Sequence, residues 1–173
     1  MSKVVLALLI ASAMSTSLTE RADAQSPVAT PPANLVQLMR GTLYPESNVV
    51  FAAQDVNPED VPHAKDPAMA TDPLASQFGK WQAVENNALA IAEVADLLSV
   101  PGRKCANGLD VPVKNPDWAK FVQELRDAGM TAYAAAQTKN QDKMTDAADV
   151  MTTACKHCHD KYRDRRNRAD RCK

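Results

Sequence analysis

The sequence contains little glycine, few aromatic residues and no sustained strand pattern. Only 5 of its 173 residues are glycine, and aromatic residues make up 5% of the chain. No stretch alternates apolar and polar residues for long enough to predict a half-buried strand, whereas alanine and other good helix formers abound. These features exclude a sheet-based fold and predict an all-α protein.

Charge of one sign and long apolar runs are also lacking. The chain has 20 Lys and Arg against 21 Asp and Glu, a net charge of -1, which gives no case for a nucleic-acid surface. Beyond the N-terminus, no segment approaches the ~20 apolar residues that a membrane-spanning helix needs. We therefore expect no nucleic-acid partner and no membrane span in the mature chain.

The N-terminus has the pattern of a secretory signal. A lysine precedes a short apolar run, and small residues follow at Ala22 and Ala24. The run is too short to span a bilayer, which favours a signal peptide over residues 1–24 and disfavours a retained anchor. A proline-rich flexible lead over 25–32 and a single domain over 33–173 would then form a periplasmic protein.

Prolines shape the expected first half of the domain. The first helix should begin near Ala33 and break at Pro45, because proline clashes with the preceding helical turn. A second helical piece should cover residues 46–54, with Ser47 as its cap. A proline-rich loop over 55–73 should follow, longer than the usual connection between bundled helices.

Three later helices are predicted from apolar seams at helical spacing. The first should cover residues 72–99 with Asp72 as its cap. The next should have Asn115 as its cap and Pro116 in its first turn, and the last should begin near residue 140 and end near Arg163. The seams are Trp81, Val84, Ala88, Ile91, Ala95 and Leu98; Trp118, Val122, Leu125, Gly129, Ala132 and Ala136; and Met144, Ala148, Met151, Cys155, Cys158 and Tyr162. Such seams predict an antiparallel four-helix bundle.

The last helix carries the attachment signature of c-type haem. Residues 155–159 read Cys-Lys-His-Cys-His, and this C-x-x-C-H pattern predicts one covalent haem c. Residues three apart share a helix face, so the thiols of Cys155 and Cys158 can meet the two vinyl groups on one edge of the porphyrin. The adjacent His159 then supplies the proximal ligand to the iron.

Two other readings of the motif remain. A redox-active dithiol normally begins a helix beside a βαβ pattern, whereas this motif lies more than three turns into its helix. A structural zinc site needs a fourth ligand, for which His157 or His63 would serve, and exported proteins rarely use such sites. Both readings are weaker than haem attachment.

Cys105 and Cys172 have no metal-like spacing. In an oxidising compartment, a leftover cysteine pair most often forms a disulfide, and this one would tie the C-terminal tail to the bundle. The alternatives are free thiols or a link between two chains.

The run from Cys155 to Arg163, on the last helix of an alanine-rich chain, resembles the cytochrome c prime group, the four-helix-bundle class of bacterial cytochromes c. The resemblance places the haem near the C-terminal end of the last helix and against the first helix. Tyr162 and Arg163 match the aromatic and basic residues that follow the family's motif. Arg163, one turn beyond His159, would meet a haem propionate or remain a solvated charge.

The resemblance also implies that the first helix decides the function. Met39 is the candidate distal ligand of a six-coordinate haem that transfers electrons, although a methionine on an apolar face is often core filling. An apolar occupant would instead leave the iron five-coordinate and able to bind nitric oxide or carbon monoxide. The candidate occupants are Leu35, Leu38 and Leu43, and His63 is a remote alternative ligand.

We expect an electron carrier rather than an enzyme, because no acid–base pair, nucleophile triad or phosphate-binding loop is apparent. Its partners would be redox proteins met transiently, and the resemblance also allows a homodimer. A permanent haem subunit of a larger exported dehydrogenase is a further alternative. The charged tail beyond Arg163 should fray. The basic residues from Lys161 to Lys173 would either steer an acidic partner or form a solvated end.

Overall fold

The computed structural model describes residues 30–173, which contain helices and no strand beyond one isolated bridge between Lys104 and Asp110. The prediction of an all-α protein is therefore confirmed. The expected signal peptide over 1–24, and the lead as far as residue 29, lie outside the described residues. No helix in 30–173 combines the length and apolar character needed to cross a membrane.

The first helical segment is continuous from Leu35 to Asp55. It comprises α1 (Leu35–Leu38), a π-helical turn η1 (Met39–Leu43) and α2 (Tyr44–Asp55). Asn34 caps its start reciprocally with Gln37, each side chain accepting a hydrogen bond from the other residue's backbone N–H at 2.9 Å.

The predicted break at Pro45 is wrong. The Tyr44 N–H donates to the Met39 carbonyl, five residues back, and the helix continues through Pro45 in the first turn of α2. A wider π turn relieves the clash between the proline ring and the preceding turn, so the helix need not end. Ser47 is not a cap either, because its hydroxyl donates to the Tyr44 carbonyl at 3.0 Å.

The proline-rich region folds into short turns. It contains three 3-10 turns, η2 (Pro58–Asp60), η3 (Pro67–Met69) and η4 (Pro73–Ala75). Asp72 caps η4 through a 2.9 Å bond from the Leu74 N–H, so the helix predicted from residue 72 begins later. That helix is α3 (Lys80–Val94), which continues as the 3-10 segment η5 (Ala95–Ser99).

The last two long helices match the prediction closely. They are α4 (Pro116–Gln137) and α5 (Gln141–Tyr162), joined by a three-residue turn. A short 3-10 turn, η6 (Arg168–Asp170), follows in the tail. The Asn140 side chain caps α5 by accepting from the Lys143 N–H at 3.0 Å.

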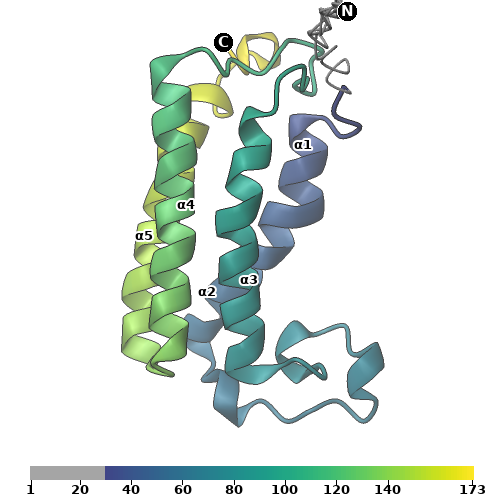
Figure 1. The fold of residues 1–173 in the computed structure, drawn as a ribbon, viewed down its shortest axis with the longest axis vertical. Coiled ribbons are helices and arrows are strands. Elements are labelled where there is room, and N and C mark those ends of the chain that lie inside the picture. Colours follow the sequence, from purple (N-terminus) through teal and green to yellow (C-terminus); the bar gives the residue numbers. More distant parts are fainter. Residues whose placement is uncertain (1–29) are drawn as a thin grey trace, which may run out of the picture.

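The four long helical segments pack side by side. α3 packs on α4, α4 packs on α5, and α2 packs on both α3 and α5. Figure 1 shows that α1 and the C-terminal turns of α5 lie at one end of this stack, which we call the motif end. The 3-10 turns of the proline-rich region lie at the other end.

The predicted seams form the core. All six residues of the α3 seam are buried, as are Trp118, Leu125 and Met151 on the other two. α4 lies close to α3 at Gly129, where a Cβ atom would lie 2.9 Å from the Ala88 carbonyl oxygen.

Candidate functional site

The C-x-x-C-H motif lies in the last two turns of α5. Because α5 begins at Gln141, Cys155 is more than three turns from the helix N-terminus, where unpaired N–H groups would lower the pKa of a thiol. Cys155 and Cys158 are half-buried free thiols that pack against the core. They continue the buried stripe of α5, as the sequence predicted.

Burial keeps both thiols neutral. It raises the pKa of Cys155 above its ordinary value, although the charge of Arg163 acts in the opposite direction. Burial, followed by the neighbouring Cys155, raises the pKa of Cys158 to about 12. A catalytic dithiol needs a thiolate with a lowered pKa, so these pKa values oppose the oxidoreductase reading.

The side chains of His157 and His159 leave α5 in different directions. His157 faces α4, where its Nδ1 lies 2.9 Å from Oε2 of Glu124. Two residues further along an α-helix is a rotation of about 200°, so His159 faces away from this contact. His159 is half-buried, and burial, together with the charge of Arg163, lowers the pKa of its imidazole. The neutral ring that results is the form that binds a metal.

The first helical segment contributes Met39 at the motif end. Met39 begins η1, is half-buried and packs against the core, as Leu35 does, while Leu38 and Leu43 are buried. η1 packs mainly on its own neighbours and on α3, whereas α2 makes the close contacts with α5. The first segment therefore lies closest to α5 along α2, away from the motif end.

A polar cluster fastens the end of α5 to the start of α4. The buried Tyr162 donates its hydroxyl proton to Oδ1 of Asp117 at 2.7 Å and accepts a bond from Nδ2 of Asn115 at 3.2 Å. Lys161 forms an ion pair with the same carboxylate. The ring of Tyr162 meets Trp118 edge-on, with centroids 5.0 Å apart. Asn115 thus precedes α4 as predicted, but its side chain does not cap the helix.

Asp117 was missed by the sequence reasoning, although a signal was present. In two antiparallel helices joined by a short turn, residues equidistant from the turn face each other. Asp117 and Lys161 are equidistant from residue 139 in the turn between α4 and α5. Hydrogen bonds from Lys161 and Tyr162 lower the pKa of the Asp117 carboxyl.

One buried donor at this end has no partner. Trp118 is 1% exposed, and its indole nitrogen makes no hydrogen bond within the described part of the chain. A buried N–H left unpaired costs about 1–3 kcal/mol. Trp118 packs against Tyr162, three residues beyond the motif, and its unpaired N–H is compatible with a bound group that supplies an acceptor.

Arg163 is paired within the chain. Its Nε and Nη2 donate to the two carboxylate oxygens of Asp164 at 2.7 and 2.9 Å. Its charge still acts on the pKa values of Cys155 and His159. Arg163 is thus an exposed charge paired with a neighbouring carboxylate, and its contact with a haem propionate stays a prediction.

The structure joins Cys105 and Cys172 in a disulfide, with Cα atoms 6.5 Å apart. Cys105 is buried in the connection between α3 and α4. In the tail, the Cys172 N–H also donates a hydrogen bond to the Tyr162 carbonyl at 2.9 Å. The tail therefore folds back on the end of α5, and the expectation that it frays is wrong.

The remaining candidate ligands lie apart from the thiols. His63 belongs to the proline-rich region at the opposite end, where its Nδ1 lies 3.0 Å from the Ser76 carbonyl. His157 is engaged with Glu124. Among residues 30–173, no group of three or more His, Cys, Asp or Glu side chains is arranged to hold a metal ion. Neither His157 nor His63 is therefore positioned with both thiols as the proposed zinc site would need.

Comparison of the chain with protein-family models, curated proteins and solved structures gave no match.

Proposed function

We propose that this chain is an exported c-type cytochrome that carries electrons through one haem c bonded to Cys155 and Cys158, with His159 as the proximal ligand. The observation that carries the proposal is the position of C-x-x-C-H deep within α5, with two neutral, half-buried thiols on its core-facing side. Such thiols suit thioether attachment better than dithiol exchange.

The donor set fits a haem. Cys155 and Cys158 are three residues apart on one helix, which suits two attachment points on one edge of a porphyrin. His159 is neutral and directed away from α4, and the orphaned indole N–H of Trp118 is a donor without an acceptor. We further propose the antiparallel four-helix-bundle class, with the haem between the end of α5 and the first helical segment.

The residues of the chain would hold and insulate the group. Bound haem supplies a one-electron couple, and the protein sets its potential through the axial ligands and the surrounding polarity. The Tyr162–Asp117 bond and the Tyr162–Trp118 contact fix the end of α5, which orients the imidazole of His159. Burial of the two thiols within the apolar stripe limits access of water to the attachment edge.

Export to the periplasm is part of the proposal. The N-terminal pattern predicts a secretory signal, and the bond between Cys105 and Cys172 is typical of an oxidising compartment.

Attachment is tested by producing the chain in a host that assembles c-type cytochromes. We expect a pigment that survives acidified organic solvent and a mass increase equal to one haem. The double substitution of Cys155 and Cys158 by Ala should abolish both. The matched control, the double substitution of Cys105 and Cys172 by Ala, should keep the pigment. A colourless wild-type protein with unmodified thiols would overturn the proposal.

The distal ligand is tested by spectroscopy of the ferric protein. If Met39 binds the iron, a near-infrared sulfur-to-iron charge-transfer band is expected, and Met39→Ala should remove it while Leu43→Ala keeps it. A high-spin spectrum that Met39→Ala leaves unchanged would reject this ligand. It would favour a five-coordinate haem that binds nitric oxide or carbon monoxide.

A further inference from the structure

Residues 163–173, which we call the tail loop, are held at both ends against the end of α5. At the start of the loop, the N–H groups of Arg163 and Asp164 both donate to the His159 carbonyl, at 2.9 and 2.8 Å. Near its end, Cys172 donates to the Tyr162 carbonyl and is bonded to Cys105. The loop is therefore closed on the same helical turn that carries the proposed iron ligand.

The tail loop is the most basic part of the chain. Six of its eleven residues are Lys or Arg and two are Asp, a net charge of +4, whereas the whole chain has a net charge of -1. Arg163 pairs with Asp164, and Lys173 pairs with Asp170 at 2.9 Å. Arg165 and Arg166 form no ion pair with any described residue. Positive charge is thus concentrated, and partly uncompensated, at the motif end.

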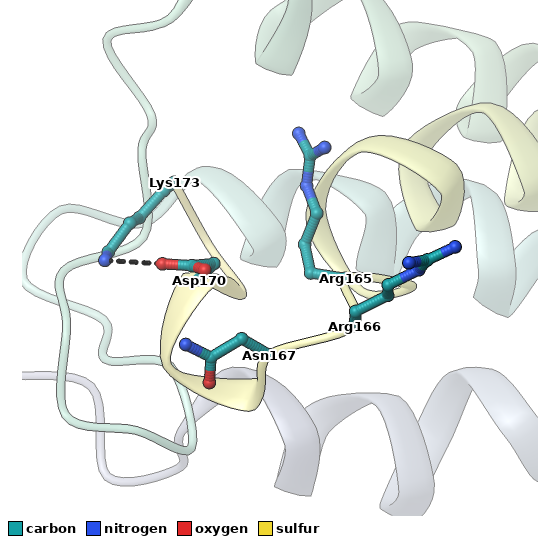
Figure 2. Close-up of a pocket in the computed structure, with 5 residues that line it drawn as sticks. All are labelled: Arg165, Arg166, Asn167, Asp170 and Lys173. Atoms are coloured by element: carbon teal, nitrogen blue, oxygen red, sulfur yellow. Dashed lines mark hydrogen bonds and ion pairs between the residues drawn. The ribbon is translucent and has the colours of Figure 1, made fainter.

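The arginines of the tail loop are spread rather than focused. An open hollow of about 430 Å³ is lined by Arg165, Arg166, Asn167, Asp170 and Lys173, whose side chains are drawn in Figure 2. The side chains of Arg165 and Arg166 extend in different directions, and neither points at the Asp170–Lys173 pair. They do not converge on one point, as a site for a single small anion requires. Their arrangement suits a broad surface that presents several carboxylates.

The composition of the tail loop also separates a protein partner from a membrane. Ala169 and Cys172 are its only residues without a charged or amide side chain, and Cys172 is taken up by the disulfide. Stable binding to an anionic membrane normally combines basic residues with apolar side chains that insert between the lipids. The tail loop offers only the basic part.

We propose that the tail loop is the docking surface for an acidic protein that exchanges electrons with the haem. This inference rests on the proposed function, because it is the haem that makes a docking surface at this end useful. A basic surface beside the attachment turn would steer the acidic partner to the shortest transfer path. A small, polar and short-lived contact is typical of redox partners. The disulfide would keep the surface formed before the partner arrives.

The first test compares two charge-reversal variants of the holoprotein. Arg165→Glu with Arg166→Glu changes the tail loop, and Lys65→Glu with Lys143→Glu makes the same change in net charge at the opposite end. The ferrous proteins are oxidised by hexacyanoferrate(III), which accepts one electron from each haem. At low ionic strength, we expect the tail-loop variant to react about tenfold more slowly and the control within about twofold of wild type. Equal slowing of both variants would overturn the proposal.

A second measurement does not depend on the haem. Calorimetric titration with poly-L-glutamate, a carboxylate-rich polypeptide, should show binding that weakens steeply as salt is added. The tail-loop variant should lose most of this binding and the control should keep it. If the protein is pigmented and both variants bind equally, the proposed docking surface is rejected and the cytochrome assignment stands. If the protein is colourless, the cytochrome assignment is rejected, and the docking proposal that rests on it is rejected as well.

Two further probes test the other anionic partners. Wild-type protein should not sediment with phosphatidylglycerol vesicles at physiological salt. Inorganic phosphate should bind the wild-type protein no more tightly than it binds the tail-loop variant. Sedimentation that the tail-loop variant lacks would assign the surface to a membrane. Saturable phosphate binding by wild type alone would assign it to a free anion. Either result would overturn the proposed protein partner.

Discussion

The pair α4 and α5 and the chain from Leu35 to Gly79 are built in different ways. Each helix of the pair has 22 residues and a single apolar stripe, and a three-residue turn joins the two helices. The earlier region bends through a π turn and three 3-10 turns. In the pair, the only proline stands in the first turn of α4, where its missing N–H costs nothing. In the earlier region, Pro45 stands within a helix. Local sequence rules predict the first arrangement, whereas in the second they do not distinguish a helix break from a π turn or a helix start from a capped 3-10 turn.

The largest effect on this contrast should come from removing the disulfide. Replacing Cys105 and Cys172 by Ala opens a link with a sequence separation of 67 residues, and should lower the free energy of unfolding by about 4 kcal/mol on the loop-entropy estimate. Denaturant titration measures the loss. Relative to wild type, the variant should show a larger increase in hydrogen-exchange rate in the last turn of α5 than in α2. An equal increase in exchange rate in α5 and α2 would show that the disulfide does not stabilise the end of α5 locally.

A smaller effect is expected where α4 meets α3. A Cβ at Gly129 would lie 2.9 Å from the Ala88 carbonyl oxygen and 2.9 Å from the Ala92 nitrogen, so Gly129→Ala must push the helices apart. Overpacking of this kind costs about 1–3 kcal/mol. Gly41, in the π turn, has no atom within 4 Å of an added Cβ, so Gly41→Ala is the matched control. It should leave stability unchanged or raise it by up to about 1 kcal/mol. Equal losses in thermal melts would show that packing does not distinguish the two regions.

The smallest effects are opposite responses to pH. The pKa of Asp117 is lowered in the folded state by hydrogen bonds from Lys161 and Tyr162. Its carboxylate therefore stabilises the fold at neutral pH, and this contribution disappears as the pH falls through the lowered pKa. Asp117→Asn should lower the denaturation midpoint at pH 7, and the deficit should shrink in acid. A deficit that is the same at every pH would reject this electrostatic role.

Glu46, in the earlier region, should behave in the reverse manner. Its Oε2 is buried without a hydrogen-bond partner among the described residues, and burial raises the pKa of its carboxyl. The neutral carboxyl is thus favoured in the folded state, and stability is lost as the pH rises from the unfolded pKa through the folded one. Glu46→Gln should raise the midpoint at pH 7 and change it little in acid. A midpoint lowered at pH 7 would show that the charged form is the stabilising one.

The regular half could be predicted because its signals are local. Pro116 in a first turn and the helical spacing of the seams each specify structure within a few residues. The joining of Cys105 to Cys172 followed from the small number of cysteines. The position of the motif within α5 followed from the helix itself.

The remaining features were missed because local patterns allow more than one structure, or because a distant contact decides between them. Pro45 predicts a helix break by every local rule, and only the π turn allows the helix to continue. The start of α3 at Lys80 rather than Asp72 reflects a capped 3-10 turn, for which Asp72 is equally suited. The bond from Asn115 to Tyr162 replaced the predicted cap. Haem attachment, the distal ligand and export stay predictions.

The π turn at residues 39–43 acts as a one-residue insertion within a helix. The Tyr44 N–H bonds to the carbonyl five residues back instead of four, and the extra residue rotates the helix before the turn relative to the helix after it. Deleting the exposed Gly41 would turn α1 by roughly 100° about its axis and exchange the side chains that it presents inwards. Evolution could thus replace one inward residue by another at this position through a single codon, without altering α2, α3 or the helix that carries the motif.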